Sequence, residues 1–111
     1  MNQVALLSIF FVTGTVYFLV SIPLLFDKIR PNRFYGIRIP KAYESVELWY
    51  RVNRLGAKVF LAYGVVMVAI GAVAWLVSLR VSLKFTPLLI GNLLLTLVSF
   101  THVLVACNRV N

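Results

Sequence analysis

The sequence predicts an all-α membrane protein. Three transmembrane helices are expected, with a cytoplasmic turn and an amphipathic helix between helices one and two. Two observations predict this fold class. Three long stretches of the chain contain no charged residue, and eight of the 11 Lys and Arg residues lie between the first and the second stretch. A chain of 111 residues is within the range of one domain, so we expect a single membrane domain over residues 1–111.

The three uncharged stretches have the length and composition of membrane spans. Hydrophobic residues make up 61% of the chain, against about 45–50% in average soluble domains. The stretches are Val4–Phe26, Val59–Leu79 and Phe85–Asn108. Each is long enough to cross a hydrocarbon core about 30 Å thick, and backbone groups in lipid must bond within their own segment. We therefore expect transmembrane helices at about 4–26, 59–79 and 85–107.

The first stretch is expected to be a retained helix rather than a cleaved signal peptide. No Lys or Arg precedes it, its apolar run is longer than that of a signal, and no A-x-A cleavage site follows.

The positions of the basic residues predict the orientation in the membrane. The first loop holds Lys28, Arg30, Arg33, Arg38, Lys41, Arg51, Arg54 and Lys58. The second loop holds only Arg80 and Lys84, and the tail holds Arg109. The positive-inside rule then places the first loop and the C-terminus in the cytoplasm and the N-terminus outside. With its aromatic residues, the basic loop favours contact with anionic lipid headgroups over nucleic acid.

The second half of the first loop has the pattern of an amphipathic helix. On a helical wheel its charged residues share an arc about 80° wide; they are Glu44, Glu47, Arg51, Arg54 and Lys58. One rod from Glu44 to Leu79 would be about 54 Å long. A bend near Gly56 is favoured, because it would let the charged segment lie along the membrane surface.

Polar residues in the third apolar stretch follow one helical face. They are Asn92, Thr96, Ser99 and His102. Polar side chains in hydrocarbon usually face other helices, so interhelical hydrogen bonds are favoured over a polar path or a proton-responsive His102.

Enzyme chemistry finds little support in the residues. One His and one Cys do not make the usual zinc site, and no Gly-rich phosphate loop precedes a helix. We therefore expect no enzyme activity, no cofactor and no metal.

The segment from Asn32 to Pro40 contains turn-forming residues and a well-placed arginine. Pro31 and Pro40 exclude a helix there, and Asn32 and Gly36 suit turns or positive φ. Arg38 lies between Gly36 and Pro40, on stiff backbone. The segment is either a structural cap on the following helix or a recognition surface.

On the apolar side of that helix, Asn53 requires hydrogen-bond partners if it is buried. The backbone and Tyr35 of the preceding turn are the expected partners.

The pattern N-x-x-Y-G-I-R-x-P, followed by W-x-x-x-N, resembles the signature of the SdpI family of small bacterial membrane proteins. Its residues here are Asn32, Tyr35, Gly36, Ile37, Arg38, Pro40, Trp49 and Asn53. The match covers about a quarter of the chain. Two positions depart from the family pattern: Ile39 and Ala42 stand where the family usually has Thr. The resemblance implies a protein of the bacterial inner membrane.

The resemblance also implies a role in binding or signalling, with immunity to a secreted toxic peptide or protection against envelope stress as its sharpest form. The binding residues it implies are Asn32, Tyr35, Gly36, Arg38, Pro40, Trp49 and Asn53. The partner would be a protein or peptide at the cytoplasmic loop. The alternative is a small accessory subunit of a larger membrane complex, and a homo-oligomer stays open. A miniature transporter is the weakest reading, because His102 is the one ionisable group inside a span that would serve it.

Overall fold

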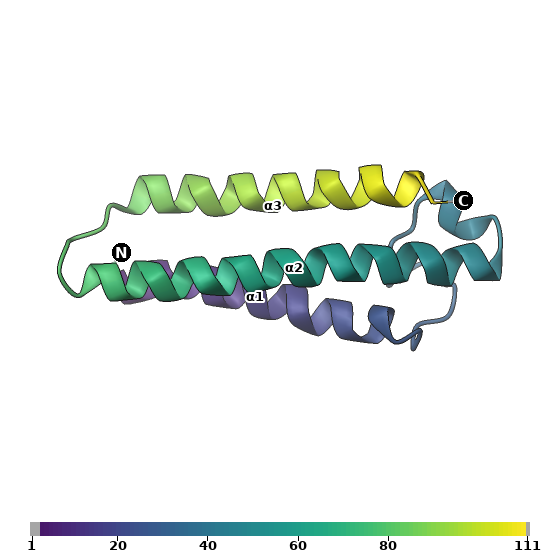
Figure 1. The fold of residues 1–111 in the computed structure, drawn as a ribbon, viewed down its shortest axis with the longest axis horizontal. Coiled ribbons are helices and arrows are strands. Elements are labelled where there is room, and N and C mark those ends of the chain that lie inside the picture. The colour runs from purple at the N-terminus through teal and green to yellow at the C-terminus, as the bar shows by residue number, and fades with distance from the viewer. Residues whose placement is uncertain (1–2, 111) are drawn as a thin grey trace.

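The structure is a computed structural model that describes residues 3–110, and every regular element in that range is helical. The elements are α1 (Gln3–Leu25), the short 3₁₀ helix η1 (Pro40–Tyr43), α2 (Val46–Ser78) and α3 (Phe85–Asn108). They form an elongated bundle of 53 × 22 × 19 Å. In Figure 1, α3 runs alongside α2, and the C-terminus lies at the same end as η1 and the long loop. The N-terminus lies towards the opposite end, where α2 connects to α3.

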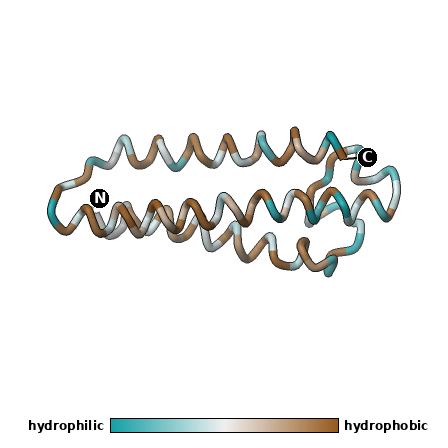
Figure 2. Tube along the Cα trace, in the orientation of Figure 1, coloured by the Kyte–Doolittle hydropathy of each residue, from teal (hydrophilic) through white to brown (hydrophobic). Residues whose placement is uncertain are grey.

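Each long helix contains an apolar window that is long enough to cross a membrane. The windows lie in Leu7–Leu25, Val46–Ser78 and Thr86–Asn108, with mean hydropathy 2.0, 2.3 and 2.1. Many outward-facing residues of these helices are large and apolar, which water would disfavour and lipid would not. Figure 2 shows the hydrophobic residues spread along the three helices and the hydrophilic ones gathered mainly towards the two ends. The predicted all-helical membrane fold with three apolar helices is confirmed.

The helices α1 and α2 approach closely at two glycines. A Cβ atom added to Gly14 would lie 2.8 Å from the carbonyl oxygen of Gly64, and one added to Gly64 would lie 3.1 Å from that of Gly14. Small residues at a crossing allow two backbones to pack together in lipid, where dispersion contacts take the place of the hydrophobic effect. This contact makes α2 the helix against which α1 packs most extensively.

Hydrogen bonds link α3 to the other two helices through the polar face predicted from the sequence. They join Asn92 to Thr13 (3.4 Å), Ser99 to Tyr17 (2.6 Å) and His102 to Tyr63 (3.0 Å). The fourth residue of that face, Thr96, bonds instead to a carbonyl of its own helix. Asn92 and Ser99 are buried, whereas His102 is exposed. The expectation of interhelical hydrogen bonds is confirmed for three of the four residues.

The bend expected near Gly56 is absent, because α2 is one helix of 33 residues that keeps its direction in Figure 1. It begins after Ser45, whose hydroxyl accepts from the backbone N–H of Leu48 at 3.0 Å. Ile37 fills the space beside Gly56, and a Cβ atom there would also lie 3.4 Å from Cys107 Sγ. Ile37 of the loop and Cys107 of α3 thus pack on the same face of α2 at Gly56, and the loop covers the apolar face that we expected to lie on the membrane.

Candidate functional site

The loop between α1 and α2 starts with a left-handed turn at Asp27. This residue has φ 58°, and the N–H of Lys28 donates to the carbonyl of Pro23 at 2.9 Å. Together with the bond from Asp27 to Leu24 (3.4 Å), this is a Schellman-type helix end. The Asp27 carboxylate also pairs with Arg54 on α2 at 3.3 Å, with side chains 41% and 46% exposed. An ion pair so open to solvent contributes at most about 1 kcal/mol to stability. Its main effect is to direct the start of the loop towards α2.

Asn32 organises the next part of the loop through its side chain. Its Oδ1 accepts from the backbone N–H groups of Phe34 (2.8 Å) and Tyr35 (2.7 Å). Its Nδ2 donates to the carbonyls of Arg30 (2.6 Å) and Tyr35 (3.1 Å). The hydroxyl of Tyr43 donates to the Asn32 carbonyl at 2.6 Å. The four side-chain bonds explain why an Asn in this position makes a defined turn, and the fifth, to its backbone carbonyl, ties the turn to Tyr43.

Tyr35 attaches the loop to α1. Its hydroxyl donates to the carbonyl of Val20 at 2.6 Å. Desolvation by burial raises the pKa of the Tyr35 phenol. The phenol therefore stays protonated, as a hydrogen-bond donor must, throughout the physiological pH range.

Gly36 lies where the loop crosses close to α2. Its φ is +119°, and a Cβ atom there would lie 2.9 Å from Asn53 Oδ1 and 3.0 Å from the ring of Trp49. The next residue, Ile37, donates its backbone N–H to that same Asn53 oxygen at 2.6 Å. Asn53 Nδ2 in turn donates to the carbonyl of Trp49 at 2.9 Å. The expected partner of Asn53 is thus found in the backbone of the turn, while the Tyr35 hydroxyl bonds elsewhere.

Trp49 fixes the loop from the side of α2. Its ring is fully buried, its Nε1 donates to the carbonyl of Ile29 at 2.9 Å, and its ring lies 5.5 Å from that of Tyr43. It belongs to an apolar cluster that joins the loop, α2 and α3: Ile37, Ile39, Ala42, Trp49, Val52, Val103 and Cys107. At the edge of this cluster Lys41 Nζ donates to the carbonyl of Asn108 at 3.2 Å, near the C-terminal end of α3, where a cation is favoured.

The two departures from the family pattern lie inside this cluster. Ile39 is buried and Ala42 fully so, and Pro40 between them opens η1. A Thr hydroxyl at either position would require a buried hydrogen-bond partner. Apolar packing therefore occupies these two positions in this chain.

Arg38 is the motif residue that points outward from this scaffold. Its side chain is exposed and its Nη1 donates to the carbonyl of Arg33. Within residues 3–110 the ion pair between Asp27 and Arg54 is the only one, so Arg38 faces no carboxylate there. Trp49 and Asn53, in contrast, are buried, so their side chains are not accessible from the surface.

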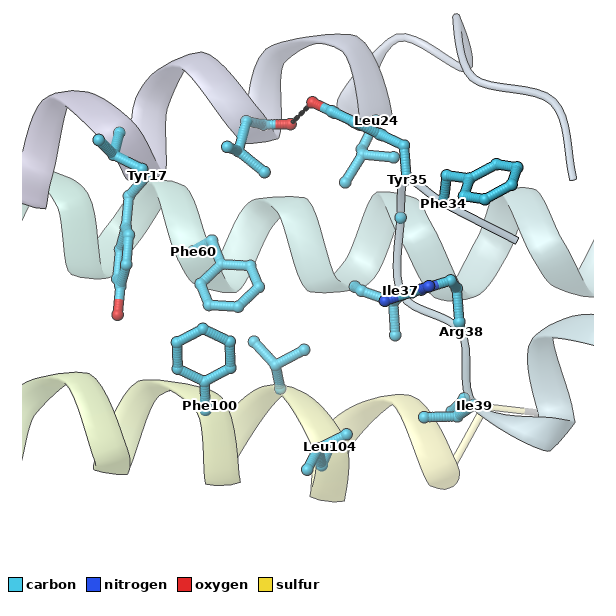
Figure 3. A pocket seen from close by; sticks show the side chains of 14 residues that line it. Tyr17, Leu24, Phe34, Tyr35, Ile37, Arg38, Ile39, Phe60, Phe100 and Leu104 are labelled. Carbon is cyan, nitrogen blue, oxygen red and sulfur yellow. Dashed lines mark hydrogen bonds between the residues drawn. The ribbon is translucent and has the colours of Figure 1, made fainter. Parts of the chain in front are cut away.

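A cavity of about 540 Å³ lies beside the loop and between α1 and α3. In Figure 3, Tyr35, Arg38 and Phe34 lie near one end of it, and Phe60 and Phe100 face each other further along. Sequence reasoning missed the cavity walls: Val16, Val20, Leu24, Phe60, Phe100, Val103 and Leu104. Their only signal in the sequence is that they are apolar residues in apolar stretches, which does not distinguish them from their neighbours.

Metal-ligating residues do not gather in the described part of the chain. Across residues 3–110 no group of three or more His, Cys, Asp or Glu side chains is placed to hold a metal ion. The chemistry that the site offers is therefore that of its exposed guanidinium, its backbone turn and the apolar cavity beside them.

Comparison with known proteins gives one finding. The searches of curated proteins and of solved structures returned no match. A family model described as the SdpI/YfhL protein family matches residues 28–106, which contain the whole motif, α2 and most of α3. The match covers well over half of the chain and agrees with the resemblance read from the motif. The chain therefore belongs to the SdpI/YfhL protein family.

Proposed function

We propose that this chain is a binding or signalling protein of the bacterial cytoplasmic membrane and that its partner recognises Arg38. The observation that carries the proposal is that most motif residues hold the loop in place, whereas Arg38 is free to contact a partner. Asn32, Tyr35, Gly36 and Asn53 hold the loop through hydrogen bonds and close contacts, while Arg38 on the same loop remains exposed. Immunity to a secreted toxic peptide, or protection against envelope stress, is the sharpest form of this function.

A rigid loop suits a recognition role because little conformational entropy is lost when a partner binds. The guanidinium of Arg38 presents several N–H donors in a plane, which matches a carboxylate or a phosphate better than a lysine would. The partner we propose is a protein or peptide that brings such an anion to the loop. Under the positive-inside rule, the eight basic residues from Lys28 to Lys58, five before α2 and three in its N-terminal part, favour the cytoplasmic side for this encounter, with the N-terminus outside.

The chemistry of the site supports binding rather than catalysis. Arg38 is the exposed motif residue with ionisable chemistry, and Tyr35 uses its hydroxyl to hold α1. We therefore propose that the protein is not an enzyme and that its action depends on occupancy of the site.

A second candidate function, a small accessory subunit of a larger membrane complex, has its own supporting observation. His102 is exposed, and its Nδ1 bonds to the hydroxyl of Tyr63 at 3.0 Å across α3 and α2. A polar pair that faces lipid is costly, and a helix of another subunit or of a second copy would cover it.

The test is complementation of a deletion strain of the native host under challenge with a secreted toxic peptide. Arg38→Ala should abolish protection at unchanged protein level, whereas Arg30→Ala, which removes another exposed arginine of the loop, should protect like the wild type. Full protection by Arg38→Ala would overturn the recognition role. Gentle affinity purification of both variants distinguishes the two candidates. A soluble regulator or peptide lost with Arg38→Ala supports the first, and a stoichiometric set of membrane subunits retained by both supports the second.

A further inference from the structure

The cavity beside the loop lies between two membrane helices. Its walls come from α1 and α3, two helices that contact each other little, and Phe60 of α2 contributes to its lining. A volume of about 540 Å³ falls within the range of about 300–1,000 Å³ that is usual for small-molecule sites. The hydrogen bond between Ser99 and Tyr17, which lines the cavity, ties α1 to α3.

The two ends of the cavity differ in chemistry. Near the Tyr17 end the rings of Tyr17, Phe60 and Phe100 pack edge to face, with centroids 5.1–6.5 Å apart. At the loop end Arg38 contributes to the lining, and so does Phe34, whose side chain is 90% exposed. An exposed Phe together with Lys and Arg residues is typical of a segment that lies at the membrane interface. The cavity is thus apolar along its length and cationic at the headgroup end.

This arrangement favours an acyl chain over a peptide as the occupant. A peptide segment brings backbone N–H and C=O groups that need hydrogen-bond partners in lipid. The walls offer Val16, Val20, Leu24, Val103 and Leu104, none of which has a polar side-chain atom. An acyl chain needs no such partners, and its anionic headgroup would meet the guanidinium of Arg38. Basic pockets between membrane helices on the cytoplasmic side bind anionic headgroups by the same chemistry.

We infer that the cavity holds one acyl chain of an anionic phospholipid from the surrounding leaflet, with the lipid phosphate bound by Arg38. A second apolar groove, between α2 and α3, provides a comparison within the same molecule. It is lined by Val66, Ala69, Ile70, Val73, Ala74, Val77, Leu83 and Leu88. No charged side chain lines it, so lipid there has no dependence on Arg38. The inference does not depend on whether a protein partner also binds Arg38.

The experiment is photo-crosslinking of the full chain, reconstituted in phosphatidylcholine vesicles, with phospholipids that carry a diazirine on one acyl chain. The probes are photoactivatable phosphatidylglycerol, photoactivatable phosphatidylcholine and a photoactivatable fatty acid. Mass spectrometry of peptides should find residues 16–24 and 100–104 labelled several-fold more by the phosphatidylglycerol probe than by the other two. In Arg38→Ala this preference should disappear, while labelling of the groove between α2 and α3 should not change.

Two tryptophan variants separate the cavity from ordinary lipid contact. Leu104 lines the cavity and is 48% exposed, so Leu104→Trp fills the cavity without disturbing a buried position. Leu97 is 65% exposed on the same helix and lines neither the cavity nor the groove, so Leu97→Trp is its matched control. Leu104→Trp should lose most of the phosphatidylglycerol labelling at residues 16–24, and Leu97→Trp should keep it.

Three results would overturn the inference. Equal labelling of the cavity by the anionic and zwitterionic phospholipids would make it ordinary lipid-facing surface. Equal labelling of residues 16–24 in the two tryptophan variants would show that the acyl chain does not enter the cavity. Stronger labelling by the fatty acid would replace the phospholipid with a single-chain carboxylate. None of these results bears on the complementation assay. Leu104→Trp keeps Arg38 and the loop intact, so the proposed function is tested separately from the lipid site.

Discussion

The side-chain oxygen of Asn53 accepts a hydrogen bond of 2.6 Å from the backbone N–H of Ile37, sixteen residues earlier in the chain. This bond joins α2 to the middle of the loop, one residue before Arg38. The same amide donates to Trp49, one turn back along α2, so both of its ends are used. A buried amide thus holds the backbone from which the exposed arginine extends.

Replacing Asn53 by Leu should loosen the loop and destabilise the protein. The N–H of Ile37 would remain buried without its partner, at a cost of about 1–3 kcal/mol. We expect a lower unfolding midpoint in detergent and faster tryptic cleavage between Lys28 and Arg38. Asn108→Leu is the control, because the Asn108 side chain is exposed and bonds only within α3. Equal cleavage rates in the two variants would contradict the role assigned to Asn53.

Gly36→Ala should also destabilise the loop, for a backbone reason. The φ of +119° disfavours any residue with a Cβ atom, at a cost of about 1–3 kcal/mol, and that atom would crowd Asn53 and Trp49. Thermal unfolding measures the loss. Gly91→Ala is the matched control, because a Cβ atom there meets nothing within 4 Å. Inside α3 that change should be neutral or stabilising by about 0.5–1 kcal/mol. A similar loss of stability in both variants would contradict the role of the positive φ at Gly36.

The hydrogen bond between Tyr17 and Ser99 should contribute to stability as a coupled pair. The two hydroxyl oxygens lie 2.6 Å apart and are buried between α1 and α3. A double-mutant cycle of Tyr17→Phe and Ser99→Ala should give a coupling energy of about 0.5–2 kcal/mol. Thr101→Ala replaces Ser99→Ala in the control cycle, since Thr101 is exposed and bonds to its own helix. A coupling energy near zero in the first cycle would mean that the bond adds no stability.

The Tyr35 phenol should titrate above its ordinary pKa of 10.0, because burial disfavours the phenolate. A raised pKa in the folded state gives a stability contribution that is complete below the unfolded pKa and is lost as the pH rises through the folded one. The phenolate also cannot donate to Val20. Phenolate absorbance is titrated with pH in the wild type and in Tyr35→Phe. The difference between the two curves is the titration of Tyr35. A midpoint at or below 10.0 would contradict the desolvation of the Tyr35 phenol.

The orientation proposed for the helices can be read with a membrane-impermeant maleimide on intact cells. Val81→Cys lies in the exposed connection between α2 and α3 and should be labelled without permeabilisation. Arg33→Cys lies in the basic loop and should be labelled only after permeabilisation. The native Cys107 is buried and should remain unlabelled, which serves as an internal control. The reverse labelling pattern would overturn the assignment of the loop to the cytoplasm.

Much of the fold and part of the site follow from the sequence alone. Three uncharged apolar stretches determine three helices, because a backbone in lipid must bond within its own segment. The polar face of α3 predicts interhelical hydrogen bonds for the same reason. The motif also predicts a defined turn, because Asn32 and Gly36 favour turns through their own side chain and backbone. Asn53, on an apolar helix face, requires a hydrogen-bond partner from that turn.

Only the tertiary structure decided what those residues do together. The packing of α2 at Gly56 depends on Ile37 and Cys107, which are distant in sequence and both contact the same face of the helix there. The division of the motif into buried supports and an exposed Arg38 depends on which side chains the loop turns inward. The cavity depends on the separation of α1 from α3, which the packing of both against α2 determines. Local periodicity carries no information on these long-range contacts, because most cavity-facing residues of α1 and α3 are as apolar as the lipid-facing residues beside them.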